Sequence, residues 1–329
     1  MNHPYADELR VGLQAVRAAA RICQTVQAAI TPDVLDKKDN SPVTIADFAS
    51  QAVVCKTIGD AFANDPIIAE EDAMALHQPE NDAFLRQIHE LIVNHYGEAS
   101  PDEIRHWIDR GGTKTYANRF WTLDPIDGTK GFLRRDQYAV ALALIIEGQI
   151  ELGILGCPNL GTRGKNSHSL FYAIRGHGTF AGNLDPASKF QSIHVSDTNS
   201  FAAAKFCESL ESGHSSHSES AMVAERLGIK TASVRLDSQA KYAVVAGGEA
   251  DIYLRLPTKT GYFEKIWDHA GGVLIVQEAG GRVTDIAGHP LDFSQGFEMR
   301  KNRGVVVTNG LLHDSVLSAI QSVVSKNGE

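Results

Sequence analysis

The sequence predicts an α/β protein built in two parts, and three observations support this fold class. Its 329 residues are 43% hydrophobic and 22% charged, which is typical of a folded globular chain. At roughly 150 residues per domain, this length fits two domains. Helical patterns and then successive strands fill the first part, whereas strands and helices alternate after residue 197. We therefore expect an α+β domain over residues 1–197 and an α/β domain over residues 198–329.

The first part is expected to open with two helices. Apolar residues recur every three or four positions from Leu9 to Ile30 and predict a helix that Pro32 ends. Thr44 is expected to cap a second helix, which places Asp47 in a first turn where the helix dipole favours a carboxylate. Strands are expected over 66–69, 120–123, 138–146, 149–156, 170–174 and 179–181, with a peripheral helical excursion over 73–112.

The segment 138–146 predicts a strand that is covered on both faces. Small and large apolar side chains alternate along it, with Ala139, Ala141 and Ala143 opposite Val140, Leu142 and Leu144. In the second part, strands are expected over 204–208, 233–236, 251–254, 282–284 and 305–308, and helices over 217–227, 238–247, 264–279 and 311–325. This alternation predicts a mostly parallel or mixed sheet surrounded by helices.

Charge and cysteine content argue against several classes of protein. The net charge of −9 is unlike that of a general nucleic-acid binder. The longest apolar run, from Tyr138 to Ile146, is far shorter than the ~20 residues that span a bilayer, and no signal-peptide pattern opens the chain. Cys23, Cys55, Cys157 and Cys207 are too spread for a disulfide framework or a zinc site. We expect a cytoplasmic protein without a nucleic-acid or membrane partner.

The string DPIDGT carries the strongest chemical signal. A predicted strand ends at Asp124, and Asp127 follows three residues later. Two carboxylates and the carbonyl of Ile126 are ligands that hard cations such as Mg²⁺ prefer. The N–H groups of Gly128 and Thr129 would face an anion held by the metal. By itself, the string is equally consistent with a turn that caps a helix.

Three further carboxylates favour a metal site. Asp47 at a helix start, Glu70 at a strand end and Asp268 in EKIWDHAGG all lie beside apolar residues, where an unpaired charge costs free energy. Each alone fits a helix cap or an ion pair. Together with Asp124 and Asp127 they make five carboxylates, enough for two or three divalent cations.

These strings resemble those of the lithium-sensitive inositol monophosphatase superfamily. That resemblance rests on NSPVTIAD, Glu70-Glu71, DPIDGTKGF and EKIWDHAGG. The strings DNSPVT, RFWTLDPIDGTKGFLR, LGCPNL, GHSSH, LDSQAKY and ADIYLRLP make it closer to the 3′(2′),5′-bisphosphate nucleotidase branch. The resemblance covers residues 5 to 325 and is least within 73–119, where GGTKTYANRF departs from the family pattern. It implies a layered αβαβα sandwich.

The resemblance also implies an activity. Branch members are Mg²⁺-dependent phosphomonoesterases that remove the 3′-phosphate of adenosine 3′,5′-bisphosphate, giving AMP and phosphate, in sulfur assimilation and salt tolerance. They also act on 3′-phosphoadenylyl sulfate, some cleave inositol 1,4-bisphosphate, and Li⁺ and often Na⁺ inhibit them. Carried over to this sequence, the ligands of two or three Mg²⁺ ions are Glu70, Asp124, the Ile126 carbonyl, Asp127 and Asp268. Asp47 and Thr129 orient and deprotonate the attacking water.

Substrate contacts follow from the same resemblance. Gly128, Thr129 and Asp268 would lie at the phosphate that is removed, and His214, Ser238, Lys241 and Arg255 would contact the adenosine bisphosphate. The residues alone favour blander roles, namely a solvated helix lysine for Lys241, an exposed strand end for Arg255 and a turn residue for His214.

Two other functions stay open from the sequence. An inositol polyphosphate 1-phosphatase would use the same metal ligands but bind a polyol in its second domain. A regulator that binds nucleotide and cations without turnover is disfavoured, because all five carboxylates and Thr129 are present. The resemblance implies a monomer.

Overall fold

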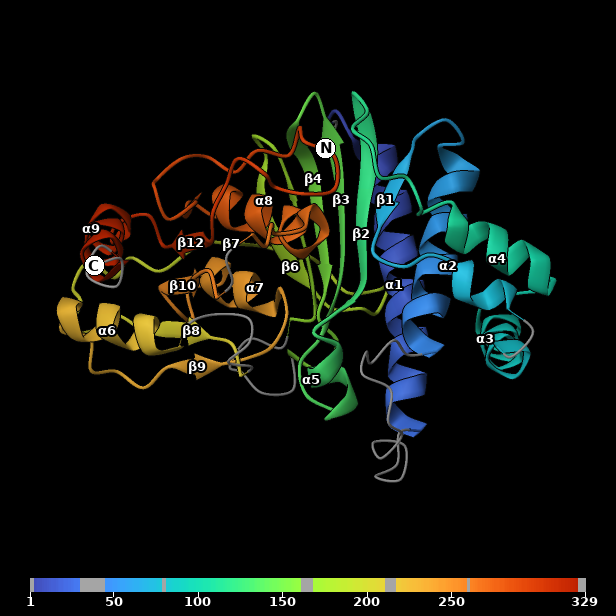
Figure 1. Ribbon diagram of the computed structural model, residues 1–329, viewed down its shortest axis with the longest axis horizontal. Helices are drawn as coiled ribbons and strands as arrows, with labels where there is room; N and C mark the ends of the chain where they lie inside the picture. Colours follow the sequence, from blue (N-terminus) through green and yellow to red (C-terminus); the bar gives the residue numbers. More distant parts are fainter. Residues whose placement is uncertain are drawn as a thin grey trace.

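Helices and sheets alternate in five layers in the computed structural model, which describes residues 3–29, 45–78, 81–160, 168–210, 217–258 and 261–324. Helices α1 (Ala6–Ala29) and α2 (Ile45–Ala61) form the first layer, followed by a seven-stranded sheet. Helices α7 (Ala240–Ala246) and α8 (Ala270–Glu278) lie between this sheet and a five-stranded one, which α6 (His217–Leu227) and α9 (His313–Val324) flank (Figure 1). The arrangement confirms the predicted αβαβα sandwich.

The first sheet has its strands in chain order. They are β1 (Ile67–Ala69), β2 (Arg119–Asp127), β3 (Ala139–Ile146), β4 (Gln149–Gly156), β5 (Leu170–Ile174), β6 (Gly178–Gly182) and β7 (Gln191–Ile193). Only the β1–β2 pair is parallel, and the other pairs are antiparallel. The short connection from β3 to β4 turns at Glu147 and Gly148, both with positive φ. The strands expected over 138–146 and 149–156 thus form a hairpin.

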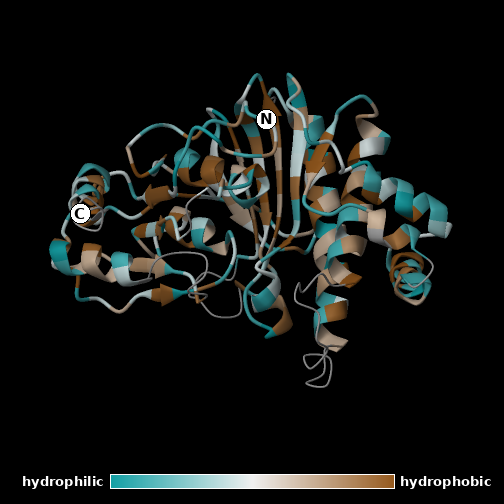
Figure 2. Cartoon of the chain, in the orientation of Figure 1, coloured by the Kyte–Doolittle hydropathy of each residue, from teal (hydrophilic) through white to brown (hydrophobic). Residues whose placement is uncertain are grey.

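The central strand β3 packs differently on its two faces, as its alternating pattern predicts. Val140, Leu142 and Leu144 belong to the core cluster that faces α1. The three alanines belong to the cluster that includes α7 and α8, so these helices approach the sheet closely. Figure 2 shows hydrophobic residues concentrated in the strands and in the helices that face them.

The second sheet is mixed, with the order β11-β12-β10-β8-β9. Its strands are β8 (Phe206–Glu208), β9 (Val234–Arg235), β10 (Ile252–Arg255), β11 (Arg282–Thr284) and β12 (Val305–Thr308). Strand β10 lies parallel to β8 and antiparallel to β12. The chain passes between the two sheets after β7, but α8 returns to cover the first sheet, and the two sheets share one core cluster. The division at residue 197 therefore stays a prediction.

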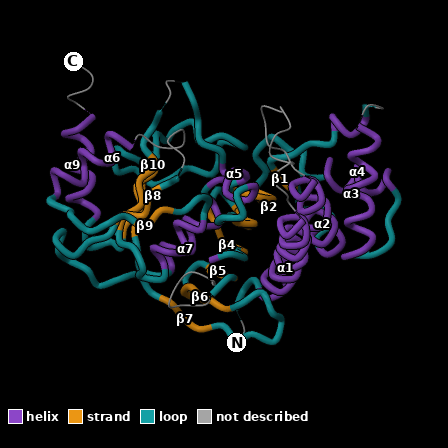
Figure 3. The backbone as a smooth tube through the Cα atoms, turned by 90° about the horizontal axis from the view of Figure 1, so that it is seen from below, coloured by secondary structure: helices purple, strands orange, loops and turns teal. Residues whose placement is uncertain are grey.

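Short helices complete the periphery. The predicted excursion contains η2 (Met74–His77), α3 (Asp82–His95) and α4 (Pro101–Asp109), and α3 and α4 pack against α2. A capping box of Ser100 and Glu103 begins α4. Helix α5 (Thr129–Leu133) follows β2 directly (Figure 3). Among the described residues, no helix is long and apolar enough to cross a membrane.

Two element boundaries were predicted wrongly. Strand β2 continues past Asp124 to Asp127, because a register shift against β3 lets the chain stay paired through the turn sequence. The helix expected over 264–279 begins only at Ala270, after a separate 3₁₀ turn, η5 (Ile266–Asp268). Asp268 thus ends a 3₁₀ turn instead of lying within a helix. Thr44 lies outside the described residues.

The close approach of α8 to β4 yields a stability prediction. A Cβ added at Gly153 would lie 2.6 Å from the carbonyl oxygen of Gly271, which is backbone and cannot move aside. Gly153→Val should therefore lower the unfolding free energy by about 1–3 kcal/mol, the usual range for overpacking, as measured by urea denaturation. Gln149→Val places the same side chain at an exposed position of β4 and should have little effect. Equal stability of the two variants would contradict the inferred contact.

Candidate active site

The four carboxylates among the predicted metal ligands line one cavity of about 740 Å³. Glu70 follows the end of β1, and Asp124 and Asp127 lie in the last part of the neighbouring strand β2. Because β1 and β2 are parallel and Ala69 pairs with Leu123, Glu70 and Asp124 emerge side by side. Asp268 reaches the same cavity from the end of η5. The lining also includes Ile126, Gly128, Thr129 and Arg255.

The carboxylates shift one another's protonation. Enclosure by the protein, followed by the charges of Asp268, Glu71 and Asp127, raises the pKa of Glu70 to about 8. Burial and the charge of Asp268 raise the pKa of Asp127 to about 6. Burial and the charge of Glu70 raise the pKa of Asp124 well above its usual value. At neutral pH Glu70 therefore retains a proton that it would release in the unfolded chain.

The donor set fits a hard divalent cation. Asp124 is buried, and its Oδ1 atom has no hydrogen-bond partner in the described structure. A buried carboxylate oxygen without a partner costs free energy unless a proton or a cation satisfies it. Carboxylate and carbonyl oxygens, without a thiolate, are the ligands that Mg²⁺ prefers. The Ile126 carbonyl accepts a hydrogen bond from the Thr129 hydroxyl at 3.3 Å.

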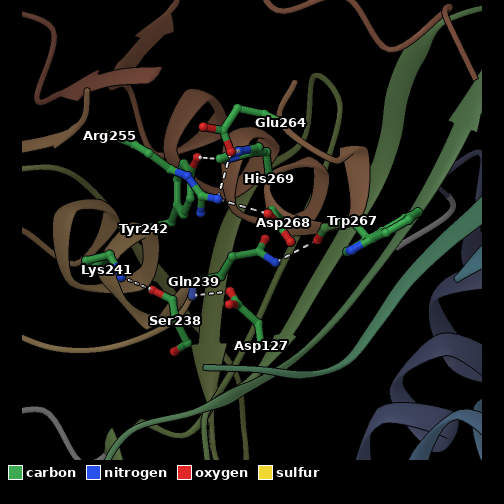
Figure 4. Close-up of polar contacts among 10 residues, drawn as sticks. All are labelled: Asp127, Ser238, Gln239, Lys241, Tyr242, Arg255, Glu264, Trp267, Asp268 and His269. Atoms are coloured by element: carbon green, nitrogen blue, oxygen red, sulfur yellow. Dashed lines mark hydrogen bonds and ion pairs between the residues drawn. The ribbon is translucent and has the colours of Figure 1, made fainter. Parts of the chain in front are cut away.

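A second polar group adjoins the carboxylates (Figure 4). The guanidinium of Arg255 lies 2.7 Å from Glu264 and 3.0 Å from Asp268. Glu264 also pairs with Nε2 of the fully buried His269 at 3.2 Å, and the Nδ1 of His269 lies 2.7 Å from the Tyr242 hydroxyl. Glu264, Asp268 and His269 place potential ligand atoms within 4.8 Å of one another. Arg255 partly neutralises the negative charge of this group. Asp268 belongs both to this group and to the predicted metal ligands.

Gln239 fixes the geometry of the two acidic segments. Its backbone N–H donates to Asp127 at 2.6 Å, and its side-chain amide donates to the Trp267 carbonyl at 2.8 Å. Its amide oxygen accepts from the Gly272 N–H at 3.1 Å. The buried Gln239 side chain and backbone therefore connect Asp127 to η5, whose last residue is Asp268.

The turn after Asp127 lies tightly against the start of α7. A Cβ at Gly128 would lie 2.9 Å from the Cβ of Ser238, and the φ of 87° at Gly128 also favours glycine. Ser238 itself has a φ of 69°, which is uncommon outside glycine and is held here by the surrounding contacts.

The residues predicted to contact the nucleotide lie in two different spaces of the structure. Arg255 lines the large cavity, whereas Ser238 and Lys241 line an adjoining space of about 10 Å³ together with Asp127, Arg255 and Asp268. Lys241 is only 4% exposed, donates to the Ser238 carbonyl at 2.8 Å, and has its pKa lowered chiefly by burial. His214 lies outside the described residues.

The predicted catalytic pair is only partly described by geometry. Asp47 is buried in the first turn of α2, and its charge contributes to the raised pKa values of Glu71 and Asp124. Thr129 lines the cavity at the start of α5. The use of Asp47 and Thr129 as a pair stays a prediction.

Sequence reasoning missed the residues that position the site. Gln239, Tyr242, Glu264 and His269 are buried polar side chains, and each lies next to a residue that the sequence did single out or within four positions of one. Lys114 donates to the Ala69 carbonyl at 3.0 Å and lies 5.3 Å from the Trp267 ring centre, so it connects the Glu70 and Asp268 segments. A polar residue among apolar neighbours is the sequence feature that could have pointed to these positioning residues.

Comparisons with known proteins agree on one family. The family model described as "Inositol monophosphatase family" matches residues 6–325. A protein of Emericella nidulans named 3′(2′),5′-bisphosphate nucleotidase is 41% identical over 97% of this chain and 99% of its own length. One of the same name from Oryza sativa is 42% identical over 99% and 97%. The solved inositol monophosphatase of Thermotoga maritima has a TM-score of 0.66 at 22% identity, covers 97% of this chain and 99% of its own, and supports the fold alone.

The crowded carboxylates yield a prediction about stability without metal. Groups whose pKa is raised on folding, such as Glu70 from 4.5 to about 8, bind more protons in the folded than in the unfolded state. In EDTA, the unfolding free energy should therefore fall as the pH rises from about 4.5 to about 8. Asp124→Asn should raise the melting temperature at pH 8 in EDTA by about 2–4 °C, for a gain of about 1 kcal/mol.

Differential scanning fluorimetry measures both effects. Asp60→Asn removes an exposed carboxylate that pairs with Lys56 on α2, and should not reproduce the gain. Added Mg²⁺ should stabilise the wild type more than Asp124→Asn. A wild type whose stability in EDTA rises towards pH 8 would contradict the inferred repulsion.

Proposed function

Since the chain belongs to the inositol monophosphatase family and is a phosphatase of the 3′(2′),5′-bisphosphate nucleotidase type, we propose that it hydrolyses the 3′-phosphate of adenosine 3′,5′-bisphosphate to give AMP and phosphate. The observation that carries this proposal is the single cavity in which four carboxylates meet Arg255. An acidic end fits a metal-bound phosphate, and a cationic side chain beside it fits a second anionic group. The same pocket would accept 3′-phosphoadenylyl sulfate.

We propose Mg²⁺ as the cofactor, as two or three ions held by Glu70, Asp124, the Ile126 carbonyl, Asp127 and Asp268. When bound, Mg²⁺ neutralises the phosphate charge, lowers the pKa of a bound water and stabilises the leaving oxygen. The unpartnered oxygen of Asp124 and the raised pKa values of its neighbours support this ligand set. Li⁺ would inhibit by replacing one Mg²⁺.

The chain's own groups supply orientation and proton transfer. Gly128 and Thr129 would direct backbone N–H groups at the phosphate from the start of α5. Thr129 would accept a hydrogen bond from the attacking water and pass its own hydroxyl proton toward Asp47, because a hydroxyl can relay a proton only when a base accepts from it. The carbonyl of Ile126, which now accepts from Thr129, would then serve as a ligand.

The second half of the chain would hold the nucleotide. We propose that residues 1–197 carry the metals and that residues 198–329 bind the adenosine bisphosphate through Arg255, Ser238, Lys241 and His214. Lys241 donates to the Ser238 carbonyl and lines the small space that Asp127 and Arg255 also line, which supports a role in holding that end of the pocket. We propose a monomer, because no proposed step requires a second chain. We also propose a cytoplasmic location.

The metal assignment is tested by Asp127→Asn. Loss of one anionic ligand at the centre of the cluster should reduce phosphate release from adenosine 3′,5′-bisphosphate by at least about 100-fold, with the fold retained by circular dichroism. Asp60→Asn is the matched control on the surface of α2 and should keep full activity. Hydrolysis at the wild-type rate by Asp127→Asn would refute the assignment, and wild-type activity unchanged across a Li⁺ titration would refute the inhibition.

The substrate class is tested by Arg255→Ala. Removing a charge-assisted donor should raise the KM for adenosine 3′,5′-bisphosphate by about 10- to 100-fold. The KM for inositol 1-phosphate should change much less, because that substrate has no second anion. Arg282→Ala removes an exposed arginine on β11 and serves as the control. Equal losses on both substrates, or release by the wild type from the inositol ester alone, would favour an inositol polyphosphate 1-phosphatase.

A further inference from the structure

The wall of the cavity beyond Arg255 contains two exposed aromatic side chains. Tyr262 and Phe263 are 52% and 37% exposed, and both line the cavity. Every other tryptophan, tyrosine and phenylalanine of the described residues is buried or half-buried, so two consecutive exposed rings in a largely charged pocket stand out. They lie in the segment between β10 and η5, directly before Glu264.

The contacts order these groups outward from the acidic end. Arg255 lies 3.0 Å from Asp268 and also forms a hydrogen bond with the Tyr262 hydroxyl. Tyr262 therefore lies beside Arg255. Phe263 instead faces Arg300, whose guanidinium carbon lies 5.9 Å from the ring centre. The cavity thus passes from carboxylates, through Arg255 and Tyr262, to Phe263 and Arg300.

The pair of Phe263 and Arg300 is held by a short antiparallel bridge. The N–H of Met299 donates to the Glu264 carbonyl at 2.9 Å, and the N–H of Ile266 donates to the Phe297 carbonyl at 3.1 Å. The neighbouring bridge pair is Lys265 with Glu298, whose side chains also form an ion pair at 2.7 Å. Phe297 in turn stacks on Trp267 with the ring centres 6.1 Å apart. The two segments are therefore fixed relative to each other.

Arg300 is positioned to support the ring and not to bind a free anion. Its Nε donates to Glu298 at 3.0 Å, and Nη2 lies 2.8 Å from the same residue. Its charge is thus partly neutralised while its plane remains near the Phe263 ring, an arrangement that stabilises the ring through cation–π attraction. The Phe263 side chain is 37% exposed and lines the cavity, so it offers an ordered aromatic surface to a planar ligand group.

We propose that Phe263, supported by Arg300, is a stacking platform for the purine base of the nucleotide. This inference rests on the proposed function, because it places the phosphate that is removed at the carboxylates and the base at the opposite end. Arg255 and Tyr262, between the two ends, then face the ribose and its second anionic group. Stacking on an aromatic ring accepts any base, so Phe263 selects nucleotides over polyols and does not read the identity of the base.

Two competitive inhibitors isolate the base. Adenosine 5′-monophosphate and ribose 5′-phosphate share the sugar and the phosphate and differ by the base alone. In the wild type, we expect the first to inhibit more strongly. In Phe263→Ala, the inhibition constant of adenosine 5′-monophosphate should rise by about 5- to 100-fold, the usual effect of losing one stacked base. The inhibition constant of ribose 5′-phosphate should not change.

Three further variants distinguish aromatic stacking from apolar bulk and from nonspecific damage to the structure. Phe263→Trp keeps an aromatic face and should retain the preference for the adenosine ligand, whereas Phe263→Leu keeps apolar bulk and should lose most of it. Leu311→Ala truncates an exposed apolar residue, 63% exposed, that does not line the cavity, and should leave both inhibition constants unchanged.

Three outcomes would overturn the platform. These are an unchanged ratio of the two inhibition constants in Phe263→Ala, an equal loss for both ligands, and equal inhibition of the wild type by both ligands. Failure of the proposed function is a different result, in which the wild type with Mg²⁺ releases no phosphate from adenosine 3′,5′-bisphosphate before any variant is compared.

Discussion

Repulsion among Glu70, Asp124, Asp127 and Asp268 is the constraint on which the rest of this structure depends. Close carboxylates in an enclosed site destabilise one another, and burial together with the neighbouring charges raises the pKa of Glu70 and of Asp127. The protein opposes it with the Gln239 N–H on Asp127 and the guanidinium of Arg255 on Asp268. Neither contact reaches Oδ1 of Asp124, so the fold keeps a place for a cation.

Close packing in the middle layers makes that arrangement geometrically feasible. The alanine face of β3 and Gly153 of β4 allow the first turn of α8 to lie directly on the sheet. A Cβ at Gly272 would lie 2.4 Å from the Tyr242 ring, so α7 and α8 are also in close contact. Since η5 immediately precedes α8, this packing brings Asp268 to the ends of β1 and β2. The same small residues therefore determine both the packing of these layers and the position of Asp268 in the site.

Local sequence predicted the elements and the acidic residues, because both depend on short-range patterns. The alternation in β3 and the carboxylates at element ends could be read directly from the chain. The continuation of β2 to Asp127 could not, because it depends on pairing with β3 across a register shift. The burial of Lys241 was also invisible, since its ammonium group binds carbonyls of its own segment. Phe263 and Arg300 meet only through the bridge at Lys265 and Glu298, which links positions more than thirty residues apart.

Arg255 lies between the acidic residues of the cavity and the aromatic residues Tyr262 and Phe263. The same guanidinium lies against Glu264 and Asp268. Burial by itself would raise the pKa of Glu264, but the charge of Arg255 and the hydrogen bond with His269 lower it to about 2. A substitution at Arg255 therefore changes both the proposed anion site and the charge around Asp268, so the comparison of KM for two substrates is what separates the two effects. Phe263 has no such double role, because its contact is with Arg300 and not with a carboxylate of the cluster. Side chains beyond Arg255 are thus the ones through which substrate choice can change while the acidic site stays intact.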